Sequence, residues 1–485
     1  MVKKTLAGGA LLLVAACGTT VPGATGASLQ GGVSSDTLPA PLASSSSAPA
    51  PVTVGGPTTG LAGPSAGQDA GAGVVASPVA LPGGGSTAGP GAPVEVGFEY
   101  ATGVTAFASA LGISADVGDG QQQAKAIVAW VNAHGGLGGH PVKPVFYALD
   151  LTRTDPYSQF MDEMCSLWTQ DHHVIAAFAY ANADFTPVAR CLTQHHALFS
   201  SYAAYTRDQA DFRQSPNWVE TSTLGAERLA QLQVRTFAAK GFLRGQTKVG
   251  LLAYDYPQAQ RQTDLLVAAL KQRGITTVIY QVHYGGSTPE LAGTITSVQS
   301  AVLRFQSEGI QRVTSAAYPG AIAFFMRYAD NQGYHPLYGL TSYDALGALP
   351  ANAPVAQLHG AIAAGWWPAA DLATSDRPAL NASGRVCRAV FTKAGIPATQ
   401  DAASFGYCDE ALSLQAAAAL VRVPVLTGDV LRVAFEHLGT SYVSPSMLGT
   451  SFAVGRHDGI AVSKPLAFND GCSCWRASGS ATPIP

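Results

Sequence analysis

The sequence has little charge and no long apolar run. Charged residues make up 12% of the chain, the formal net charge is −3, and no run of lysine and arginine follows residue 94. Because nucleic acids are bound by clustered cations, this pattern excludes a nucleic-acid partner from the expected functions. No apolar stretch reaches the about 20 residues that a membrane-spanning helix needs. The chain is therefore not expected to span a membrane.

Recognisable catalytic motifs are missing as well. From residue 94 on, the chain has no Gly-x-Ser-x-Gly elbow, no Walker loop and no His-Glu-x-x-His helix. We therefore predict a protein that is not an enzyme and uses no cofactor. A lipid-anchored hydrolase is kept as the least favoured alternative, because folds of one class host many chemistries.

A metal site is not predicted either. The two histidine pairs, His172-His173 and His195-His196, are possible metal ligands. Both pairs are expected at the amino edge of a sheet, away from the strand ends where ligands bind, and no carboxylate accompanies them at ligand spacing. The sequence favours a surface or packing role for these histidines.

The first 17 residues have the pattern of a targeting signal. Lys3 and Lys4 precede a short apolar run, residues 6–16, which ends in Val14-Ala15-Ala16-Cys17. Small residues before a cysteine are what a lipoprotein peptidase accepts, so we expect a lipidated Cys17 at the start of the mature chain. The alternative is an ordinary signal peptide cut nearby, with Cys17 left as a thiol. We expect a protein anchored by lipid alone at the extracytoplasmic face of the cell membrane.

Residues 18–93 contain no aromatic residue, and their only charged residues are Asp36 and Asp69. Such a segment buries too little apolar surface to offset the conformational entropy of folding. Its Gly, Ala, Ser and Pro content predicts a disordered tether between the anchor and the folded part. The alternative is a passive leader with no mechanical role.

Six cysteines follow Cys17, and an even number in an exported chain favours disulfides. Their grouping predicts that Cys165 pairs with Cys191 and Cys387 with Cys408. A bridge between Cys472 and Cys474 is less certain, because it closes a ring across a single residue. A metal or redox role for this pair is a further alternative.

Strand and helix patterns alternate from residue 94 on, and the alternation restarts near residue 249. Two such runs predict an α/β protein with two Rossmann-like lobes, each a mostly parallel sheet with helices on both faces. The predicted strands are residues 94–98, 142–149, 174–178, 197–200, 249–253, 275–282, 312–317 and 337–340, and the chain reaches residues 218–221 before the second run begins. The predicted helices lie near residues 124–131, 156–169, 185–194, 265–270, 291–305 and 321–329.

Tyrosines recur in the loops that follow the predicted strands. Ligands of open parallel sheets bind at the carboxyl ends of the strands, and a tyrosine offers both an apolar face and a hydroxyl to a partly wet pocket. Some of these tyrosines are instead expected to cap sheet edges. The predicted ligand-binding residues are Tyr100, Thr102, Tyr180, Asn182, Tyr202, Tyr205, Tyr254, Tyr256, Tyr318, Tyr343 and Asp344.

One segment resembles a known family. Residues 127–142 include Asn132-Ala133-His134-Gly135-Gly136-Leu137-Gly138 between a helix and a strand that ends at Asp150. This pattern is similar to the type 1 periplasmic binding proteins, in particular the leucine/isoleucine/valine-binding branch of ABC-transporter receptors. The resemblance also covers the spacing of Cys165 and Cys191, which matches a first-lobe disulfide of that branch.

The resemblance implies a hinged receptor whose chain crosses between its lobes three times, near residues 220–223, 365–371 and 444–450. It implies lobe 1 from residues 94–221 and 365–445, and lobe 2 from residues 222–364 and 446–485. The receptor would bind a small organic ligand, close on it, and deliver it to a membrane permease. We expect a monomer in solution.

The resemblance also suggests roles for individual loops. An acidic residue in the last loop of lobe 2 would pair with a ligand ammonium, which points to Asp344. Tyr180-Ala181-Asn182-Ala183 offers fewer small hydroxyls than the loop that holds the ligand carboxylate in amino-acid receptors. The ligand is therefore expected to be amino-acid-like or more aromatic and apolar. A sensor that acts on a signalling protein is the alternative to transport.

Overall fold

The computed structural model describes residues 91–110, 116–180, 184–202, 206–285, 290–316, 320–421 and 423–485. Cys17 and residues 18–90 of the predicted tether lie outside these residues, as do the predicted site residues Asn182, Tyr205 and Tyr318. None of the helices in the described ranges has both the length and the apolar character needed to cross a membrane.

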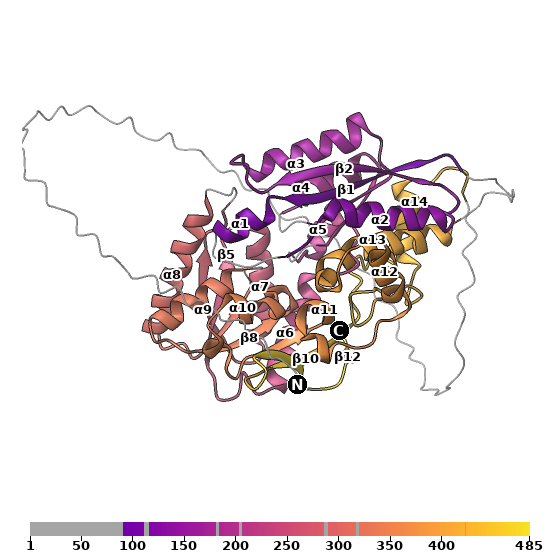
Figure 1. The fold of residues 1–485 in the computed structure, drawn as a ribbon. Helices are drawn as coiled ribbons and strands as arrows, with labels where there is room; N and C mark the ends of the chain where they lie inside the picture. Colours follow the sequence, from indigo (N-terminus) through magenta and orange to yellow (C-terminus); the bar gives the residue numbers. More distant parts are fainter. Residues whose placement is uncertain are drawn as a thin grey trace, which may run out of the picture. The chain divides into compact units, whose positions relative to one another are not determined.

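The first sheet has four parallel strands in the order β2-β1-β3-β4. Its central strands are buried on both sides, which explains their short continuous apolar runs. Helices α3 and α4 cover one face, and α2 lies on the other (Figure 1). The bounds are β1 (Val94–Thr102), α1 (Val104–Ala110), α2 (Gly120–Ala133), β2 (Val142–Asp150), α3 (Tyr157–Ser166), β3 (Ala176–Ala179), α4 (Thr186–Gln194) and β4 (Leu198–Ser201).

Three helices from the last third of the chain complete this core. They pack with α2 over the buried side chains of Val96 and Phe98 on β1. The longest, α13, is buried over most of its length and carries apolar residues on all sides, as expected of a helix enclosed by neighbours. The bounds are α12 (Ala382–Lys393), α13 (Asp401–Ala419) and α14 (Gly428–Glu436). We call this sheet and its helices lobe 1.

The second sheet has eight strands, ordered β11-β10-β9-β8-β7-β5-β6, with β12 paired to β10. Strands β5 to β9 are parallel, whereas β10, β11 and β12 are antiparallel. The strands are β5 (Lys248–Tyr254), β6 (Thr276–Val282), β7 (Arg312–Ser315), β8 (Leu337–Thr341), β9 (Ile362–Gly365), β10 (Val462–Asn469), β11 (Cys474–Ala477) and β12 (Thr482–Pro483). We call this sheet and its helices lobe 2.

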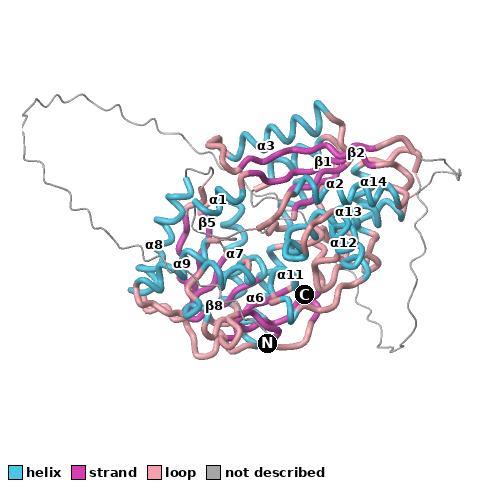
Figure 2. Tube along the Cα trace, in the orientation of Figure 1, coloured by secondary structure: helices cyan, strands magenta, loops and turns pink. Residues whose placement is uncertain are grey.

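Helices cover both faces of the second sheet. α6 and α7 contribute to one buried core, and α8 and α9 contribute to the other. Figure 2 shows the resulting alternation of helices and strands along the chain. The bounds are α6 (Ala226–Ala239), α7 (Pro257–Lys271), α8 (Leu291–Ser307) and α9 (Ala321–Asn331), with short helices α5 (Gln209–Gln214), α10 (Leu349–Asn352) and α11 (Pro368–Asp371) in connections.

These elements confirm the predicted two-lobed α/β fold. The chain passes from lobe 1 to lobe 2 between β4 and α6, returns between β9 and α12, and passes again between α14 and β10. The residue at which each lobe begins and ends stays a prediction. Residues 218–221, which lead into the first crossing, form no strand of the first sheet. Trp218 and Glu220 make only single bridges, to Phe199 and Asp458, because the chain is leaving the first sheet there.

Three disulfides are present in the described residues. Cys165 pairs with Cys191 and Cys387 with Cys408, as the grouping in the sequence predicts. The third joins Cys472 to Cys474.

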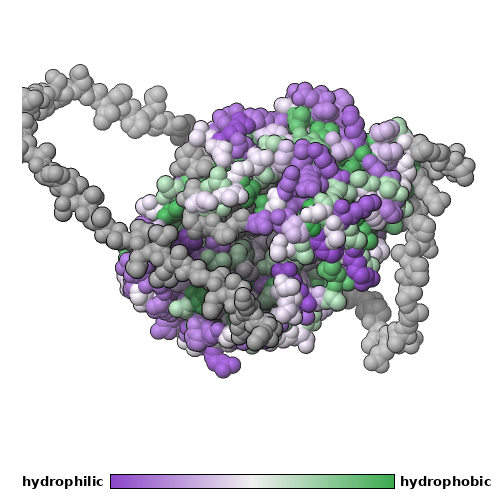
Figure 3. Space-filling view, viewed as in Figure 1, coloured by the Kyte–Doolittle hydropathy of each residue, from purple (hydrophilic) through white to green (hydrophobic). Residues whose placement is uncertain are grey.

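Hydrophilic side chains predominate over α3, along the upper edge of the space-filling view in Figure 3.

Candidate functional site

A cavity of about 600 Å³ is lined by residues of both lobes. Lobe 1 contributes Tyr180 and Tyr202, which directly follow β3 and β4. Lobe 2 contributes the turn after β8 and the hairpin between β10 and β11. The segment after β9 forms a third wall. The lining includes the side chains of Tyr180, Tyr202, Ser342, Tyr343, Trp366, Trp367, Asp371, Arg377, Ser473, Cys474 and Trp475.

Tyr180 and Tyr202 form the aromatic wall of lobe 1. Strands β3 and β4 are parallel neighbours in which Ala179 is paired with Ser201, so the next residue of each strand stands beside the other. The two rings stack with centroids 5.2 Å apart and planes 16° from parallel. On the far side of Tyr202, the ring of Trp367 meets it edge-on at 5.1 Å. This arrangement matches the offset and edge-to-face geometries that aromatic pairs prefer.

Helix α13 supports this wall from behind. The ring of Tyr407 stacks on Tyr180 with centroids 5.2 Å apart. Between the helix and the wall lies Gly406, where a Cβ atom would stand 2.6 Å from Cε2 of Tyr180 and 2.9 Å from Cδ1 of Tyr202. Only a glycine lets the helix approach the two tyrosines this closely.

We expect Gly406→Ala to destabilise the protein by about 1 to 3 kcal/mol, because the added methyl group overpacks the stacked rings. Alanine is the better helix former by about 1 kcal/mol, so propensity alone predicts stabilisation. The sign of the change therefore tests the contact. Urea unfolding measures it, with Gly293→Ala in α8 as the control, since a Cβ there meets only the ring edge of the exposed His283, at 3.1 Å. Equal effects of the two substitutions would contradict the argument.

Tyr343 and Trp366 form the opposite part of the lining. Their rings meet at 5.0 Å with planes 76° apart. The Tyr343 hydroxyl accepts a hydrogen bond from the Leu224 backbone N–H at 2.6 Å and lies 3.1 Å from the Leu224 carbonyl oxygen, to which it donates. Because Leu224 lies on the first crossing between the lobes, this hydroxyl ties lobe 2 to that crossing.

Asp371 is the acidic residue of the cavity, and it was not predicted. Its Oδ2 accepts hydrogen bonds from the Ser342 hydroxyl at 2.7 Å and from the Trp367 N–H at 3.0 Å. Burial raises the pKa of this carboxyl to about 7. Arg377, also in the lining, is half-buried, and its Nε donates to the Leu372 carbonyl oxygen at 3.0 Å. The cavity thus combines aromatic walls with one acidic and one basic group.

Asp344, predicted to meet a ligand ammonium, does not line this cavity. Its Oδ2 accepts a hydrogen bond from the Thr341 N–H at 2.8 Å and closes the turn that follows β8. The carboxyl is 2% exposed, and burial raises its pKa to about 7. Of the predicted site residues, the structure brings Tyr180, Tyr202 and Tyr343 to the cavity.

Tyr254 and Tyr256 lie in a separate aromatic cluster with Tyr284. The ring of Tyr284 is 5.3 Å from that of Tyr254 and 4.8 Å from that of Tyr256. On β1, the ring of Tyr100 packs edge-on against Phe146 in the core of lobe 1, and Thr102 ends the strand with its carbonyl bonded to the Leu151 N–H. None of these four predicted residues lines the cavity.

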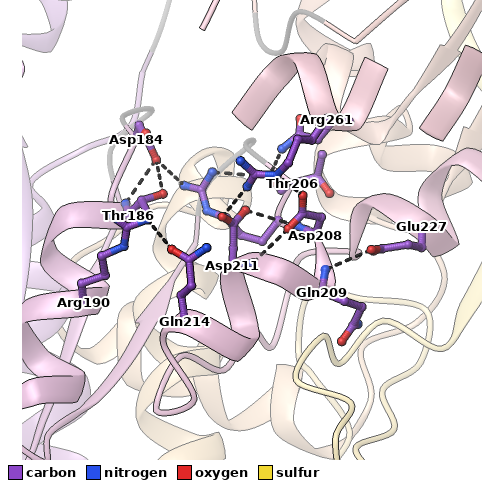
Figure 4. Close-up of polar contacts among 12 residues, drawn as sticks. Asp184, Thr186, Arg190, Thr206, Asp208, Gln209, Asp211, Gln214, Glu227 and Arg261 are labelled. Carbon is purple, nitrogen blue, oxygen red and sulfur yellow. Dashed lines mark hydrogen bonds and ion pairs between the residues drawn. The ribbon is translucent and has the colours of Figure 1, made fainter. Parts of the chain in front are cut away.

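An ion pair joins the two lobes (Figure 4). Arg261 of α7 in lobe 2 contacts Asp208, and its Nη2 lies 2.5 Å from Oδ1 of Asp211 in α5. Phe212 of α5 is part of the lobe 1 core. The side chains of the two aspartates are only 6% and 2% exposed. Next to them, Gln262 donates to the Thr206 carbonyl oxygen across the same boundary. We call Arg261, Asp208 and Asp211 the clasp.

The histidine pairs make separate local contacts. Nδ1 of His172 lies 3.2 Å from Glu95, and Nδ1 of His173 bonds to the Thr169 carbonyl oxygen. His196 contacts Asp429 at 2.7 Å. Within the described ranges, no group of three or more His, Cys, Asp or Glu side chains is arranged to hold a metal ion.

Comparison with known proteins gives a consistent result. A sequence model of the family described as "Periplasmic binding protein" matches residues 103–464. No curated protein matches the chain. Among solved structures, an ABC-transporter substrate-binding protein of Aeropyrum pernix is similar, with a TM-score of 0.62 and 14% identity, over 81% of this chain and 96% of the other.

Two further solved structures are similar over 81% of this chain. A branched-chain amino acid ABC transporter protein from Thermus thermophilus, solved with bound valine, has a TM-score of 0.57 and 14% identity over 97% of its own length. A solute-binding protein from Rhodopseudomonas palustris, solved with 4-hydroxybenzoate, has a TM-score of 0.56 and 15% identity over 98% of its length. At these identities the likeness concerns the fold.

Proposed function

Because the chain belongs to the periplasmic binding protein family, we propose that it is an extracytoplasmic solute-binding receptor of an ABC importer, which holds one small organic ligand between its lobes. The observation that carries the proposal is the cavity whose aromatic walls come from both lobes and from the segment that connects them. A ligand that contacts both walls favours closure, because it binds the closed form more tightly than the open form.

The lining favours an aromatic carboxylate as the ligand. Tyr180, Tyr202 and Trp367 give the cavity a largely apolar, aromatic lining. Arg377 supplies a guanidinium, which pairs well with a carboxylate. The solved relatives with valine and with 4-hydroxybenzoate support the two ligand classes considered, amino acids and aromatic acids. The number of aromatic side chains in the cavity favours the second class.

Anchoring and delivery are further parts of the proposal. The sequence before residue 18 supports a lipid anchor on Cys17, and family membership supports an ABC permease as the membrane partner. The receptor would act as a monomer, without catalysis. A sensor that presents its closed form to a signalling protein remains the alternative, and an adjacent sensor-kinase gene in place of permease and ATPase genes would favour it.

A ligand screen by thermal unfolding tests the proposal. We expect 4-hydroxybenzoate or a related aromatic carboxylate to raise the melting temperature, since a ligand at 100 times its Kd stabilises the folded state by about 2.7 kcal/mol. Tyr202→Leu should abolish the shift, because it removes the ring between Tyr180 and Trp367. Tyr328→Leu in α9, away from the cavity, is the control.

The outcomes separate the parts of this proposal. A shift with branched-chain amino acids alone would overturn the aromatic assignment and leave the receptor role. No shift with any member of either class, and no small molecule that co-purifies in mass spectrometry, would contradict the receptor role itself.

A further inference from the structure

The hairpin between β10 and β11 ends in a disulfide at the cavity wall. Asn469 is the last residue of β10 and is paired with Cys474, the first of β11. The bridge from Cys472 to Cys474 lies in the turn between them. Ser473, Cys474 and Trp475 all belong to the lining of the cavity. This disulfide therefore lies at the site where the ligand is proposed to bind.

The covalent ring contributes little to holding the fold together. A disulfide stabilises a protein mainly by restricting the unfolded chain, and this effect grows with the number of residues enclosed. Here one residue, Ser473, is enclosed, and its backbone has a φ of +48°, a left-handed conformation that side-chain-bearing residues seldom adopt. Opening the ring frees Ser473 from that conformation and removes no contact between distant parts of the chain.

The other two bridges have the opposite character. Cys387 and Cys408 are both fully buried and join α12 to α13 across 21 positions of sequence. Cys165 and Cys191 are half-buried and join α3 to α4 across 26 positions. In contrast, Cys472 is exposed and Cys474 half-buried. A thiol in solution can reach the sulfur of Cys472 without unfolding of either lobe.

We propose that Cys472–Cys474 is a reversible thiol–disulfide exchange site in the cavity wall, open to small thiols. A thiolate of the small thiol attacks Sγ of Cys472, the S–S bond breaks, and its electron pair leaves on Sγ of Cys474, which takes up a proton. A second small thiol then attacks the mixed disulfide at the sulfur of the first. Two protein thiols and one oxidised small-thiol dimer result, so the two electrons gained by the protein come from the two small thiols.

The redox state of this site sets the shape of the wall beside it. Trp475 follows Cys474 directly, is 1% exposed, and packs edge-on against Phe468 at 5.7 Å. In the disulfide form the closed ring fixes the position from which β11 begins. Reduction relaxes the turn and releases a thiol at Cys474 into the lining. The affinity of the cavity for its ligand then depends on redox conditions outside the cytoplasm.

Equilibration of the full chain in glutathione buffers of defined composition tests the proposal without any ligand. Free thiols are trapped by alkylation and assigned by peptide mass spectrometry. For each bridge, the measured quantity is the ratio of the squared GSH concentration to the GSSG concentration at which half of the bridge is reduced, where GSH and GSSG are reduced and oxidised glutathione. We expect this ratio to be at least about tenfold lower for Cys472–Cys474 than for Cys387–Cys408. Return to an oxidising buffer should restore the bridge, and the far-ultraviolet circular dichroism, which reports the backbone fold, should stay unchanged while Cys472–Cys474 is reduced and reoxidised.

Variants connect the chemistry to the cavity. Reduction of Cys472–Cys474 at glutathione ratios that leave Cys387–Cys408 oxidised should change the tryptophan fluorescence of the native protein. The paired substitution Cys472→Ser with Cys474→Ser should already show the changed spectrum and respond no further. The paired substitution Cys387→Ala with Cys408→Ala is the matched control, and should leave the midpoint of the Cys472–Cys474 transition in place.

Three results would overturn the proposal. The first is that Cys472–Cys474 is reduced only together with the other two bridges, or only when the protein unfolds. The second is that Cys472 and Cys474 remain free thiols in oxidising buffer. The third is fast reduction by a thioredoxin-type protein with none by glutathione, which would replace small thiols with a protein dithiol as the exchange partner. None of these results bears on whether the cavity binds a solute.

Discussion

Substitution of Arg261 by Gln is expected to weaken ligand binding by roughly 30-fold, because it removes the ion-pair partner of both carboxylates of the clasp and leaves only Arg207 as a cation near Asp211. Asp208 and Asp211 are nearly buried against α7, and removing one partner of a buried pair strands the other in a poorly solvated place. Arg261 itself is 39% exposed, so we expect a cost on the order of 2 kcal/mol, below that of a fully buried pair. This free-energy cost applies only to the closed form, in which the two lobes are in contact.

Two measurements check this expectation. Solution scattering of the unliganded protein should show a larger radius of gyration for Arg261→Gln, and calorimetry should show weaker binding of the compound found in the thermal screen. Lys271→Gln, also on α7 but exposed, removes the same charge and is the control. Arg261→Gln should change the free energy of unfolding of the individual lobes, measured in urea, only slightly.

A double-mutant cycle identifies the contact itself. If the clasp acts as described, Arg261→Gln should cost less in an Asp211→Asn background, because the amide needs no cation. Equal costs in both backgrounds, with an unchanged radius of gyration, would show that the lobes close without the clasp.

The second large effect concerns pH. We expect the free energy of unfolding to fall by several kcal/mol as the pH rises from about 5 to about 7.5. The cause is that each crossing between the lobes is tied by a buried carboxyl. Glu220 accepts hydrogen bonds from the hydroxyls of Ser201 and Thr223 at the first crossing, and Asp371 accepts one from Ser342 at the second.

At the third crossing, Asp409 of α13 holds the start of the segment that leads to β10. It accepts hydrogen bonds from the hydroxyls of Ser444, at 2.5 Å, and Tyr442. Burial raises the pKa of Glu220, Asp371 and Asp409 to about 7 each. Burial also raises the pKa of the neighbouring Glu410, whose Oε1 accepts a hydrogen bond from the Thr221 hydroxyl.

The sign of the pH effect follows from linkage. The pKa values of these carboxyls are raised above those of the unfolded chain, about 4, so the folded protein binds more protons between about pH 4 and pH 7. The stabilisation is therefore complete below about pH 4 and is lost as the pH rises through about 7. A shift of three pKa units corresponds to at most about 4 kcal/mol for one group.

Asp409→Asn tests this assignment, because the amide keeps the shape and the hydrogen-bonding capacity but does not titrate. We expect a flatter dependence of the unfolding free energy on pH between 5 and 7.5, measured by urea unfolding at a series of pH values. Asp162→Asn, at an exposed position of α3, should leave the slope unchanged. A native slope near zero in this interval would refute the raised pKa values.

The sequence predicts the strands and the loops that follow them better than it predicts the site. Apolar runs identify the buried parallel strands, and their alternation with helices identifies the two lobes. Tyr180 and Tyr202 were found because a residue directly after a strand must lie at the carboxyl edge. The same rule also selects Tyr254 and Tyr256, which cluster elsewhere, because it does not say which strand ends face the other lobe.

Other site residues carry no such signal. Trp366, Trp367 and Asp371 lie on a crossing whose path depends on how the two lobes pack, and Trp475 lies in an antiparallel hairpin that the expected parallel sheets do not include. The adjacent tryptophans at positions 366 and 367 are the feature of the sequence that points to this segment. The spacing of apolar residues does not predict helix α13, because its apolar residues lie on all sides of the helix.

The origin of α12, α13 and α14 in the last third of the chain has a consequence for biogenesis. The face of the first sheet that bears Val96 and Phe98 is covered by α2 alone until residues 382–436 have left the export machinery. Strands β5 to β9 follow one another in the sequence before residue 382, so the parallel part of the second sheet can assemble before the first sheet is fully covered. Chains interrupted before residue 382 would expose that apolar face, and we expect them to aggregate or to be degraded.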